Sequence, residues 1–546
     1  MNKRFLALLA FSALTLCSCA ETIYDLLPTG GSHVTPPQSF TPISVVPHDV
    51  KEGQTAMKFQ YSTFTENGVG TISYSPSLGE SKLLLIPVWF NDSKTFIQPT
   101  RRDQIREDIR KTYLGSTAET GWHSVKSYYE TESMGRLKLS GTVSDWYETT
   151  SSYMNFAAAE EGGENTLKLL ESATNWYFSK NPSEKRTDYD KDGDGYLDGV
   201  MLIYAAPDYV SLGKDRQSDS YGNLWAYCFW LQDHEKQSKA NPGVNVFFWA
   251  SYDFMYDGSH ASSRTGLSRC GKGNNTVCFP DAHTYIHEMG HVFGLEDYYD
   301  YGPSQYNHAG GFSMQDYNVG GHDPFSAIAL GWTDPYIPTE STEITLSIYE
   351  KEHDCILLTP SWNSVDSPFD EYLLLELYSP YGLNELDANY KYENILGPRS
   401  IGIRLWHVDA RLVACNEVES DSYYNYPVYS ISDLTVDPRD GVYGTRTAFT
   451  NTVDDEDYGT PLGSTYDKYS ILKLIRNSAV APLHNKATID SSDLFGNGAE
   501  FSMSRFKSQF ANQTKLNSGE ELGWSFKVTL TGSGSDTQAK VTLTKA

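Results

Sequence analysis

Runs of apolar residues alternate with polar stretches in the first half of the chain, and this pattern predicts both strands and helices. Residues 83–90 and residues 200–205 are continuous apolar runs of a length that suits a buried strand. Residues 137–143 alternate between apolar and polar positions, which is typical of a half-buried strand. Residues 101–114 carry mixed charges and are helix-like. We therefore expect helices and strands to be mixed in this half of the chain.

The pattern changes after Pro335, where short alternating segments recur. These segments are 372–378, 401–408 and 524–530. A Gly/Ser stretch at 532–535 then leads to a last alternating segment at 539–544, and together they predict a terminal hairpin. The C-terminal part is therefore predicted to be largely β, with a sandwich as the favoured arrangement.

The first nineteen residues have the pattern of an export signal. A basic start at Lys3 and Arg4 precedes an apolar run, residues 5–16, that is too short to span a bilayer. The run ends at Leu16-Cys17-Ser18-Cys19, which resembles the bacterial lipobox, so Cys19 is the expected lipidation site. An ordinary secretory signal is the alternative. Either pattern predicts export, and the lipobox predicts anchoring to the bacterial membrane, at the outer membrane or the cell surface.

Four segments follow from these patterns. Residues 1–19 are predicted to be the signal, and residues 20–75, which are rich in Pro, Thr and Ser, a tether or short pro-segment. Residues 76–335 form the mixed α/β part and residues 336–546 the β-rich part.

The composition narrows the classes of partner and the redox chemistry. The chain of 546 residues has a net charge of -27, which argues against nucleic acid as a partner because phosphate contacts require clustered Lys and Arg. Cys270 and Cys278 lie in a Gly/Asn-rich loop and are the best disulfide candidates in an oxidising compartment. Cys228, Cys355 and Cys415 leave an odd thiol, so the full pairing stays open.

The segment His287-Glu288-Met289-Gly290-His291 has the HExxH pattern. Positions i and i+4 of a helix lie on one face, so His287 and His291 can bind one zinc ion. Glu288 lies beside them and can accept a proton from the attacking water without binding the metal. A helix with two surface histidines is the alternative interpretation.

Three further residues favour a zinc site. Gly294 is placed to end the helix with a left-handed turn. Asp297 occupies the third-ligand position of the extended HExxHxxGxxH pattern, with Glu296 and Asp300 as rival ligands. Met314 follows Gly310-Gly311 and matches the Met-turn that accompanies such sites. Tyr317 and His322 could stabilise an oxyanion, but packing is the better expectation for both.

The acidic stretch from Asp190 to Asp198 matches the first nine positions of an EF-hand calcium loop. Its expected ligands are Asp190, Asp192, Asp194, the carbonyl of Tyr196, and Asp198. Position twelve is Met201 instead of Glu, and the residues that follow predict a strand. We therefore expect a structural calcium loop outside a true EF-hand pair. A bare Asp/Gly turn is the alternative, and Asp188 becomes a ligand if the frame shifts by two residues.

Taken together, these motifs resemble those of the immune inhibitor A-type secreted metallopeptidases. The resemblance spans roughly residues 80 to 410. It is carried by residues 124–129, 135–137, 146–147, 190–206, 287–297, 314, 324–327, 330–332, 372–376 and 402–409. The stretch before residue 80 is too short and nondescript to show the pro-segment of that family.

The resemblance implies a metzincin-like α/β (α+β) catalytic domain over residues 76–335, followed by an all-β, sandwich-like region. It implies bound calcium, and it carries over His287, His291 and Asp297 as zinc ligands. The expected function is that of an exported zinc endopeptidase, which cleaves extracellular proteins or glycoproteins through a zinc-activated water with Glu288 as general base. The alternative function is that of a surface adhesion or glycan-binding protein with a non-catalytic metal site.

Overall fold

The structure is a computed structural model that describes most of the chain outside its N-terminal forty-two residues. It describes residues 43–61, 74–120, 122–159, 161–215, 219–231, 236–256, 280–301, 307–316, 320–389, 396–414, 445–447, 450–452, 470–478 and 489–546. The predicted lipidation site Cys19 and the predicted disulfide Cys270–Cys278 lie outside these residues. The described Cys228 and Cys355 are buried free thiols.

The chain divides into two compact units. Unit 1 comprises Met1–Ser39, Thr71–Glu130 and Leu137–Gly294, and unit 2 comprises Phe40–Gly70, Thr131–Arg136 and Leu295–Ala546. The units therefore meet in the sequence at Gly294, whereas the sequence predicts a domain boundary after residue 335. The predicted domain assignment remains a prediction.

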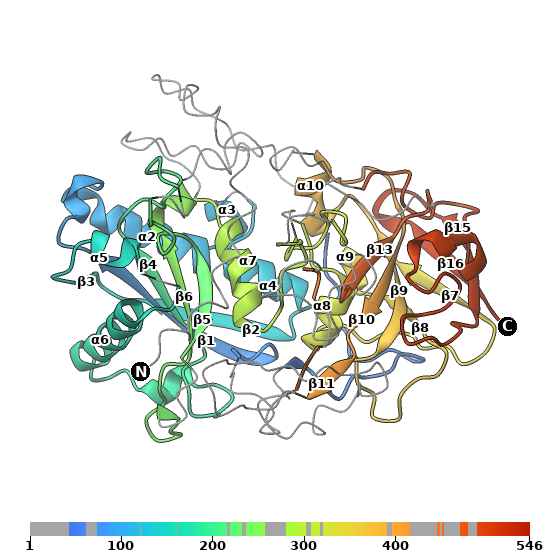
Figure 1. Cartoon of the computed structure of the whole chain (residues 1–546), viewed down its shortest axis with the longest axis horizontal. Helices are drawn as coiled ribbons and strands as arrows, with labels where there is room; N and C mark the ends of the chain where they lie inside the picture. Colours follow the sequence, from blue (N-terminus) through green and yellow to red (C-terminus); the bar gives the residue numbers. More distant parts are fainter. Residues whose placement is uncertain are drawn as a thin grey trace. The chain divides into compact units, whose positions relative to one another are not determined.

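Unit 1 is built on a mixed sheet with the strand order β2-β1-β4-β6-β5, in which β3 also pairs with β1 (Figure 1). The strands are β1 (Gly79–Trp89), β2 (Leu137–Val143), β3 (Tyr147–Glu148), β4 (Val200–Tyr204), β5 (Tyr227–Trp230) and β6 (Val246–Ser251). All pairs in this sheet are parallel except β5 with β6. β4 is buried along its whole length, as its continuous apolar run predicts.

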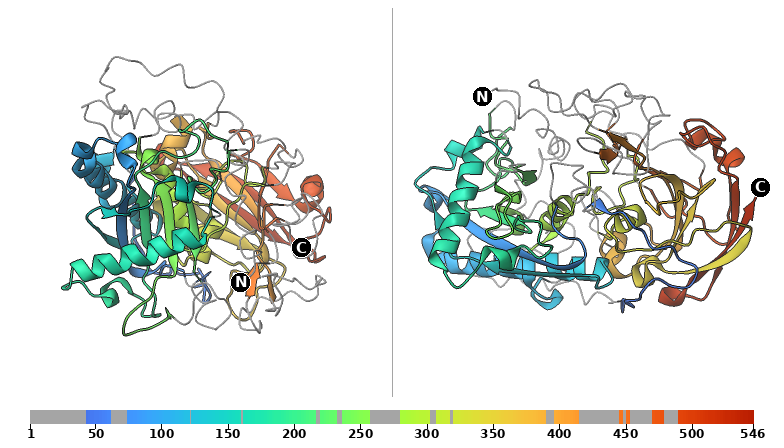
Figure 2. Two further views of the ribbon diagram at one scale, coloured as in Figure 1. Left: turned by 60° about the vertical axis from the view of Figure 1, so that its left-hand side comes forward. Right: turned by 90° about the horizontal axis from the view of Figure 1, so that it is seen from below.

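Helices accompany this sheet in unit 1. The α-helices are α2 (Arg102–Leu114), α3 (Thr117–Thr120), α4 (Val125–Glu132), α5 (Met154–Ala157), α6 (Glu164–Lys180) and α7 (His283–Val292), and the 3₁₀ helices are η3 (Ser93–Thr95), η4 (Pro99–Arg101), η5 (Arg186–Tyr189) and η7 (Tyr252–Met255). α2 contacts β2, α6 contacts β4, and α7 contacts β5 and β6. The two views in Figure 2 show α6 as the long helix of this unit.

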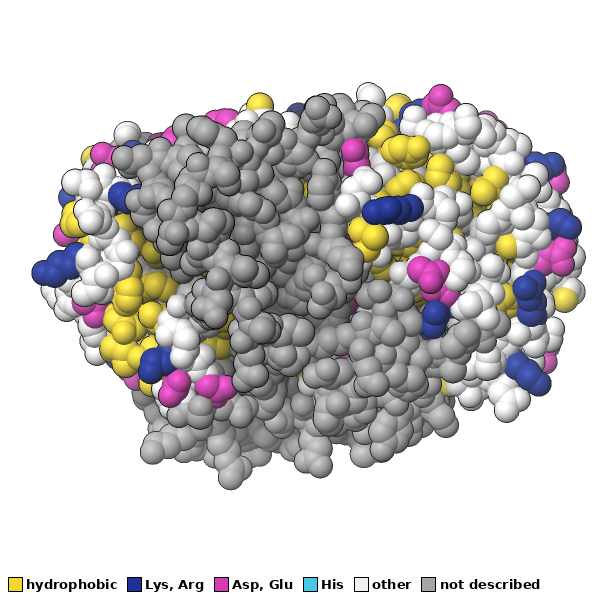
Figure 3. All heavy atoms as spheres, turned by 90° about the horizontal axis from the view of Figure 1, so that it is seen from above, with side chains coloured by type: hydrophobic (Ala, Val, Ile, Leu, Met, Phe, Trp, Pro, Cys, Tyr) yellow, Lys and Arg dark blue, Asp and Glu magenta, His cyan; other side chains and the backbone are white. Residues whose placement is uncertain are grey.

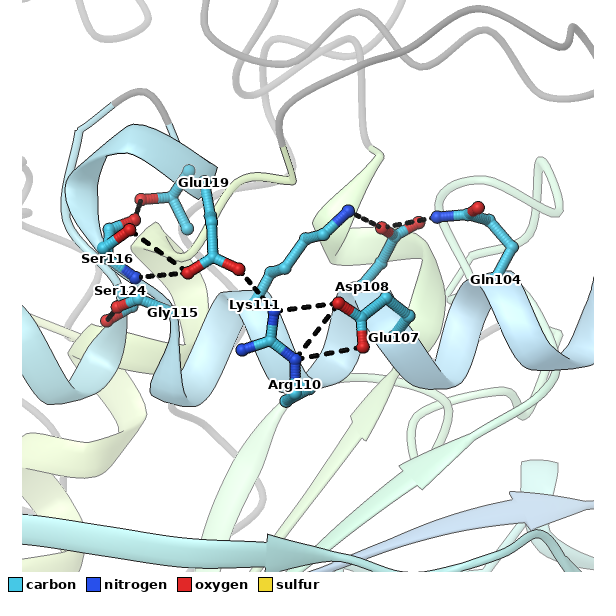
Figure 4. A network of polar contacts seen from close by, with 10 residues as sticks. Gln104, Glu107, Asp108, Arg110, Lys111, Gly115, Ser116, Glu119 and Ser124 are labelled. Atoms are coloured by element: carbon cyan, nitrogen blue, oxygen red, sulfur yellow. Dashed lines mark hydrogen bonds and ion pairs between the residues drawn. The ribbon is translucent and has the colours of Figure 1, made fainter.

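The sequence of α2 explains its two faces. Ile105, Ile109 and Tyr113 recur every four residues and are buried. On the outer side, Arg110 lies between two glutamates, with its Nη2 at 2.8 Å from Glu107 Oε1 and with a second bond to Glu119 (Figure 4). The backbone N–H of Ser116 and the guanidinium of Arg110 lower the pKa of Glu119 to about 2.

Unit 2 contains two four-stranded antiparallel sheets and a two-stranded one. The sheet orders are β13-β10-β9-β8, β14-β15-β16-β7 and β11-β12. The strands are β7 (Thr342–Ser347), β8 (Cys355–Leu358), β9 (Glu371–Tyr378), β10 (Gly402–Asp409), β11 (Leu412–Ala414), β12 (Thr445–Thr447), β13 (Leu472–Ile475), β14 (Glu500–Ser502), β15 (Trp524–Thr531) and β16 (Gln538–Lys545). The helical segments are α8 (Pro324–Ala329), α9 (Tyr349–Glu352), η9 (Gly382–Asn384), α10 (Glu385–Asn389), α11 (Met503–Phe506), η13 (Lys507–Gln509) and η14 (Gly534–Asp536).

Both four-stranded sheets of unit 2 contribute to one hydrophobic core. Leu373, Leu375 and Leu377, which alternate along β9, lie in this core together with residues of β15 and β16. Phe501 of β14 stacks on Phe526 of β15 at a centroid distance of 5.2 Å. Full burial of such a side chain contributes roughly 1.5–3 kcal/mol. The sandwich arrangement of the two sheets remains a prediction.

The chain that follows α7 contacts the β8–β9–β10–β13 sheet at its edge strand β13 and on the side away from this core. Helix α8 contacts β9. The backbone N–H of Leu474 on β13 donates to the carbonyl of His308 at 2.9 Å, and Arg404 on β10 donates to the carbonyl of Phe312 at 3.4 Å. The segment after the HExxH helix therefore packs on the C-terminal sheet within the same unit.

Arg404 and Glu376 form a buried ion pair on this face of the sheet. Arg404 Nε lies 2.8 Å from Glu376 Oε1, and both side chains are at most 1% exposed. Trp406 Nε1 donates to the same carboxylate at 2.7 Å. Burial raises the pKa of Glu376 in spite of the adjacent guanidinium.

Arg404→Met is expected to lower the free energy of unfolding by about 3–5 kcal/mol, because it leaves the Glu376 carboxylate buried without its counter-charge. Urea unfolding monitored by circular dichroism measures this loss. The matched double variant Arg404→Met/Glu376→Gln removes both charges and keeps the acceptor for Trp406, so it should recover much of the stability. A loss below about 1 kcal/mol in the single variant would show that the pair does not stabilise the fold.

Several elements predicted from the sequence are confirmed. The strands predicted at 83–90, 137–143 and 200–205 are β1, β2 and β4, and the helix-like region at 101–114 is α2. The predicted terminal hairpin is the antiparallel pair β15–β16, in which Leu530 faces Ala539.

Two further features of the described residues are the distribution of charged side chains on one face and the character of the helices. On the face drawn in Figure 3, the described Lys and Arg side chains lie scattered among acidic and uncharged ones. Among the described residues, no helix combines the length and the apolar character that crossing a membrane requires.

Candidate metal centre

Helix α7 carries the HExxH segment and is fixed against unit 1 on two sides. Tyr285, on the buried side of the helix, donates its hydroxyl to the carbonyl of Ser251 at the end of β6, at 2.7 Å. Tyr129 of α4 donates its hydroxyl to the carbonyl of Ile286 at 2.7 Å, and its ring packs edge-on against Phe293. These contacts hold the helix turn immediately before His287 in place.

The two histidines lie on one side of α7, as their spacing predicts. The ring centroids of His287 and His291 are 5.1 Å apart, and the rings are nearly perpendicular at 84°. Both side chains are half-buried, whereas their helix neighbours Met289 and Val292 are buried. The histidines are therefore accessible to an ion while the rest of the helix packs into the unit.

Glu288 lies between the histidines in the sequence and is only 8% exposed. Cys228 of β5 is close enough that burial, followed by the Glu288 charge, raises the pKa of its thiol. Burial also raises the pKa of the Tyr113 hydroxyl on α2, and the neighbouring Tyr285 and Glu288 raise it further. At 8% exposure, the Glu288 carboxylate is largely shielded from bulk water.

The helix ends as its sequence predicts. Gly294 has a positive φ of 105° and donates its N–H to the carbonyl of His291 at 2.9 Å. A residue with a side chain is strained at such a φ, so glycine suits this turn. The turn redirects the chain toward Asp297.

Potential ligand atoms of His287, His291 and Asp297 lie within 4.8 Å of one another. Among the described residues, this grouping contains Asp297 and neither of the rival carboxylates Glu296 and Asp300. Two imidazoles and a carboxylate are a donor set that zinc accepts, with bonds of about 2.0–2.2 Å. Small rotations of the side chains would bring these atoms to such distances, so the residues fit a zinc ion.

Tyr301 contacts the expected third ligand and was not identified from the sequence. Its hydroxyl donates to Asp297 Oδ2. A hydrogen bond of this kind orients a ligating carboxylate. Tyr301 is one of 38 tyrosines in the chain, and no motif sets it apart from the others.

The segment predicted as a Met-turn is a tight turn in unit 2. Gly310 and Gly311 have positive φ angles of 74° and 82°, and Met314 is fully buried. Ser313 donates its hydroxyl to Asp323 at 2.8 Å, which fixes the turn to the start of α8. The assignment of Met314 to a metal-site turn remains a prediction.

The structure describes His322, one of the two residues considered for oxyanion stabilisation. Tyr317 lies outside the described residues. His322 is buried, its backbone N–H donates to Glu132 at 3.1 Å, and it lines a small pocket of unit 2 that also includes Tyr349 and Glu350. Burial raises the pKa of Glu350 to about 8. This environment agrees with the packing role expected for His322.

The acidic loop of unit 1 brings together three of its five expected ligands. Carboxylate oxygens of Asp190, Asp192 and Asp194 lie within 4.8 Å of one another. Asp198 is outside this group, since its carboxylate accepts the backbone N–H groups of Lys82 at 2.6 Å and Lys191 at 2.8 Å. Its pKa is raised to about 8 by burial.

The loop backbone turns sharply after Asp194. The N–H of Tyr196 donates to Asp194 at 2.7 Å, and Gly195 adopts a positive φ of 97° at the bend. Strand β4 follows the loop, as expected for an acidic loop outside an EF-hand pair.

Comparison with known proteins finds a partial and distant similarity. The pre-pro-metalloprotease PrtV of Vibrio cholerae serotype O1, in strain M66-2 and in strain ATCC 39315, is 24% identical to the chain over 209 residues. This chain is distantly similar to a metalloprotease. The match covers 35% of the chain and 20% of the relative, so the chain spans about a fifth of the length of the proteins it matches. No family model matches the chain.

Proposed function

We propose that this chain is a zinc-dependent endopeptidase. The observation that carries the proposal is the grouping of His287, His291 and Asp297 within 4.8 Å, with Glu288 next to the first histidine. The similarity to a metalloprotease supports the same class of activity. The finer assignment, to the immune inhibitor A-type metallopeptidases with a metzincin-like catalytic domain, rests on the sequence motifs.

His287, His291 and Asp297 would hold the metal. When bound, zinc would lower the pKa of a water molecule and polarise the scissile carbonyl. Glu288 accepts the proton of the attacking water and returns it to the leaving amine. Both proton transfers require the Glu288 carboxylate to reach the reacting atoms. Because Glu288 lies on helix α7, its side chain can turn only in a limited set of directions.

Removal of the metal tests this proposal. The purified chain should clear a casein zymogram, a chelator should abolish the clearing, and added zinc should restore it. Clearing that persists in the chelator would exclude metal-dependent hydrolysis. A lack of clearing despite bound zinc would favour the adhesion or glycan-binding alternative.

The adhesion or glycan-binding alternative would use aromatic side chains that are at least partly exposed, such as Trp176, Trp230 and Trp362. The large exposed hydrophobic side chains among the described residues are Val46, Val50, Leu78 and Met154, and none of them is aromatic. Trp249, Trp332 and Trp406 are fully buried. These tryptophans therefore belong to the core, where they cannot act as flat platforms for a sugar.

Calcium binding by the acidic loop is part of the proposal. The oxygens of Asp190, Asp192 and Asp194 suit a hard cation, and a peptide carbonyl such as that of Tyr196 can complete the shell. Asp198 lies outside the group of three, and its carboxylate accepts the backbone N–H groups of Lys82 and Lys191. The bound ion would fix the loop that leads into β4.

Calcium is therefore expected to raise the melting temperature of the chain. At 100 times the Kd, a ligand that binds only the folded state adds about 2.7 kcal/mol to stability. Differential scanning fluorimetry with and without calcium measures the shift, which Asp192→Asn should abolish. Asp188→Asn is the control, because Asp188 lies outside the group of three and should leave the response intact. Equal responses in both variants would contradict the site.

The proposed enzyme acts outside the cytoplasm, on extracellular proteins or glycoproteins, while anchored through Cys19. Cells that express the chain should incorporate labelled palmitate into it, and Cys19→Ser should prevent this. Labelling that survives the substitution would exclude Cys19 as the lipidation site.

A further inference from the structure

Three residues far downstream in the sequence contact the residues next to Asp297. These residues are Thr447, Asn451 and Thr452, and each is at most 3% exposed. They contact the residues that flank Asp297 on both sides, within unit 2. About 150 residues of sequence separate the two groups.

Asn451 makes the most extensive of these contacts. Its Nδ2 donates to the carbonyl of Tyr298 at 2.9 Å and to the carbonyl of Leu472 at 2.9 Å. Its Oδ1 accepts the backbone N–H of Leu472 at 3.1 Å. Leu472 is the first residue of β13, which pairs with β10. The peptide that follows Asp297 is therefore tied to the C-terminal sheet through one amide side chain.

Thr452 holds the residue that contacts the Asp297 carboxylate. The backbone N–H of Tyr301 donates to Thr452 Oγ1 at 3.1 Å, and the hydroxyl of Tyr301 donates to Asp297 Oδ2. The orientation of the carboxylate thus depends on the position of Tyr301, and that position depends on Thr452.

Thr447 contacts the rival carboxylate. Its hydroxyl donates to Glu296 Oε1 at 3.4 Å. The metal-ligand group contains Asp297 alone of the three candidate carboxylates.

We propose that Asn451 and Thr452 are positioning residues for Asp297, so that the C-terminal part of the chain completes the metal site. The inference rests on the proposed function only in taking Asp297 as a metal ligand, and it does not require peptidase activity. Residues that orient a metal ligand from outside the coordination shell change metal affinity by about 10- to 100-fold when they are replaced.

The test measures zinc affinity in the full-length chain, by competition with a chromogenic chelator. Asn451→Ala and Thr452→Val are each expected to weaken zinc binding by about 10-fold or more. Thr452→Ser keeps the hydroxyl and should restore wild-type affinity. The absorption spectrum of the cobalt-substituted chain should change in the two weakened variants, because its bands report ligand geometry.

Asn363→Ala is the matched control. Asn363 also donates to a backbone carbonyl and accepts a backbone N–H, both from Ser367 and both at 2.9 Å. Its loss should lower the melting temperature of the metal-free chain and leave the zinc affinity unchanged. If Asn451→Ala fails to fold, Thr452→Val and Thr452→Ser still decide the question, because they differ chiefly in one hydroxyl.

Wild-type zinc affinity and an unaltered cobalt spectrum in Asn451→Ala and Thr452→Val would overturn the inference. That result, in a chain that still cleaves casein, would leave the proposed function intact. Weakened zinc binding in variants of a chain that cleaves no protein would support the inference and exclude the peptidase.

Discussion

Glu288→Gln is expected to keep one zinc ion per chain while casein cleavage falls by about 10²- to 10⁴-fold, the usual contribution of a general base. The amide has the shape of the carboxylate but cannot accept the proton of the attacking water. Glu288 is not a member of the metal-ligand group, so its replacement should leave the metal bound. Zinc analysis by mass spectrometry and initial rates on casein measure the two quantities.

Glu132→Gln is a suitable control for this variant. Glu132 is also a buried glutamate, at 2% exposure, and burial raises its pKa well above the usual range. Burial already disfavours the charged form of this carboxyl group and Glu132 is outside the metal-ligand group, so the amide should keep turnover. Retained turnover in Glu288→Gln would assign the base to another group.

His291→Ala is expected to lose both the metal and the turnover. One of three protein ligands is removed, so zinc content should fall well below one per chain and cleavage should fall to background. The fold should persist, because α7 is held by Tyr285 and Tyr129 through contacts that do not involve the histidine. Zinc content, cleavage rate and the circular dichroism spectrum are measured on the same sample.

His283→Ala is the matched control on the same helix. His283 precedes His287 by four residues, as His287 precedes His291, and it is not in the metal-ligand group. It should keep both zinc and turnover. Full zinc content in His291→Ala, or its loss in His283→Ala, would contradict the ligand assignment.

Much of the local structure could be predicted from the sequence because it follows from short-range periodicity. The apolar run at 83–90 became β1, and the pair of alternating segments near the C-terminus became the hairpin β15–β16. The placement of both histidines on one side of α7 follows from their i, i+4 spacing alone. Gly294 ends the helix for an equally local reason.

The rest of the candidate site depends on contacts between distant residues. The amide of Asn451 donates to the carbonyl of Tyr298, yet about 150 residues of sequence separate the two and no spacing rule links them. The acidic loop shows the same limit, since its spacing predicts five ligands while the carboxylate of Asp198 binds backbone N–H groups instead. Ligand spacing specifies which residues can meet, and tertiary packing decides which of them do.

The division of the chain at Gly294 also depends on packing. Hydrophobic patterning changes at Pro335, and that change predicts a boundary there. The chain from Leu295 onward nevertheless packs on the β8–β9–β10–β13 sheet, through α8 and through the bond from Leu474 to His308. A pattern of apolar positions shows that a segment is buried, but it does not show which surface buries it.

The most direct test of the central claim is the cleavage of casein by the purified full-length chain loaded with one zinc ion per molecule. Mass spectrometry of the products identifies the bonds that are cut. The zinc-loaded chain should produce peptides with new internal ends, and the same chain after chelation should leave casein intact. Intact casein in the presence of a chain that holds its full zinc content would contradict the proposed function.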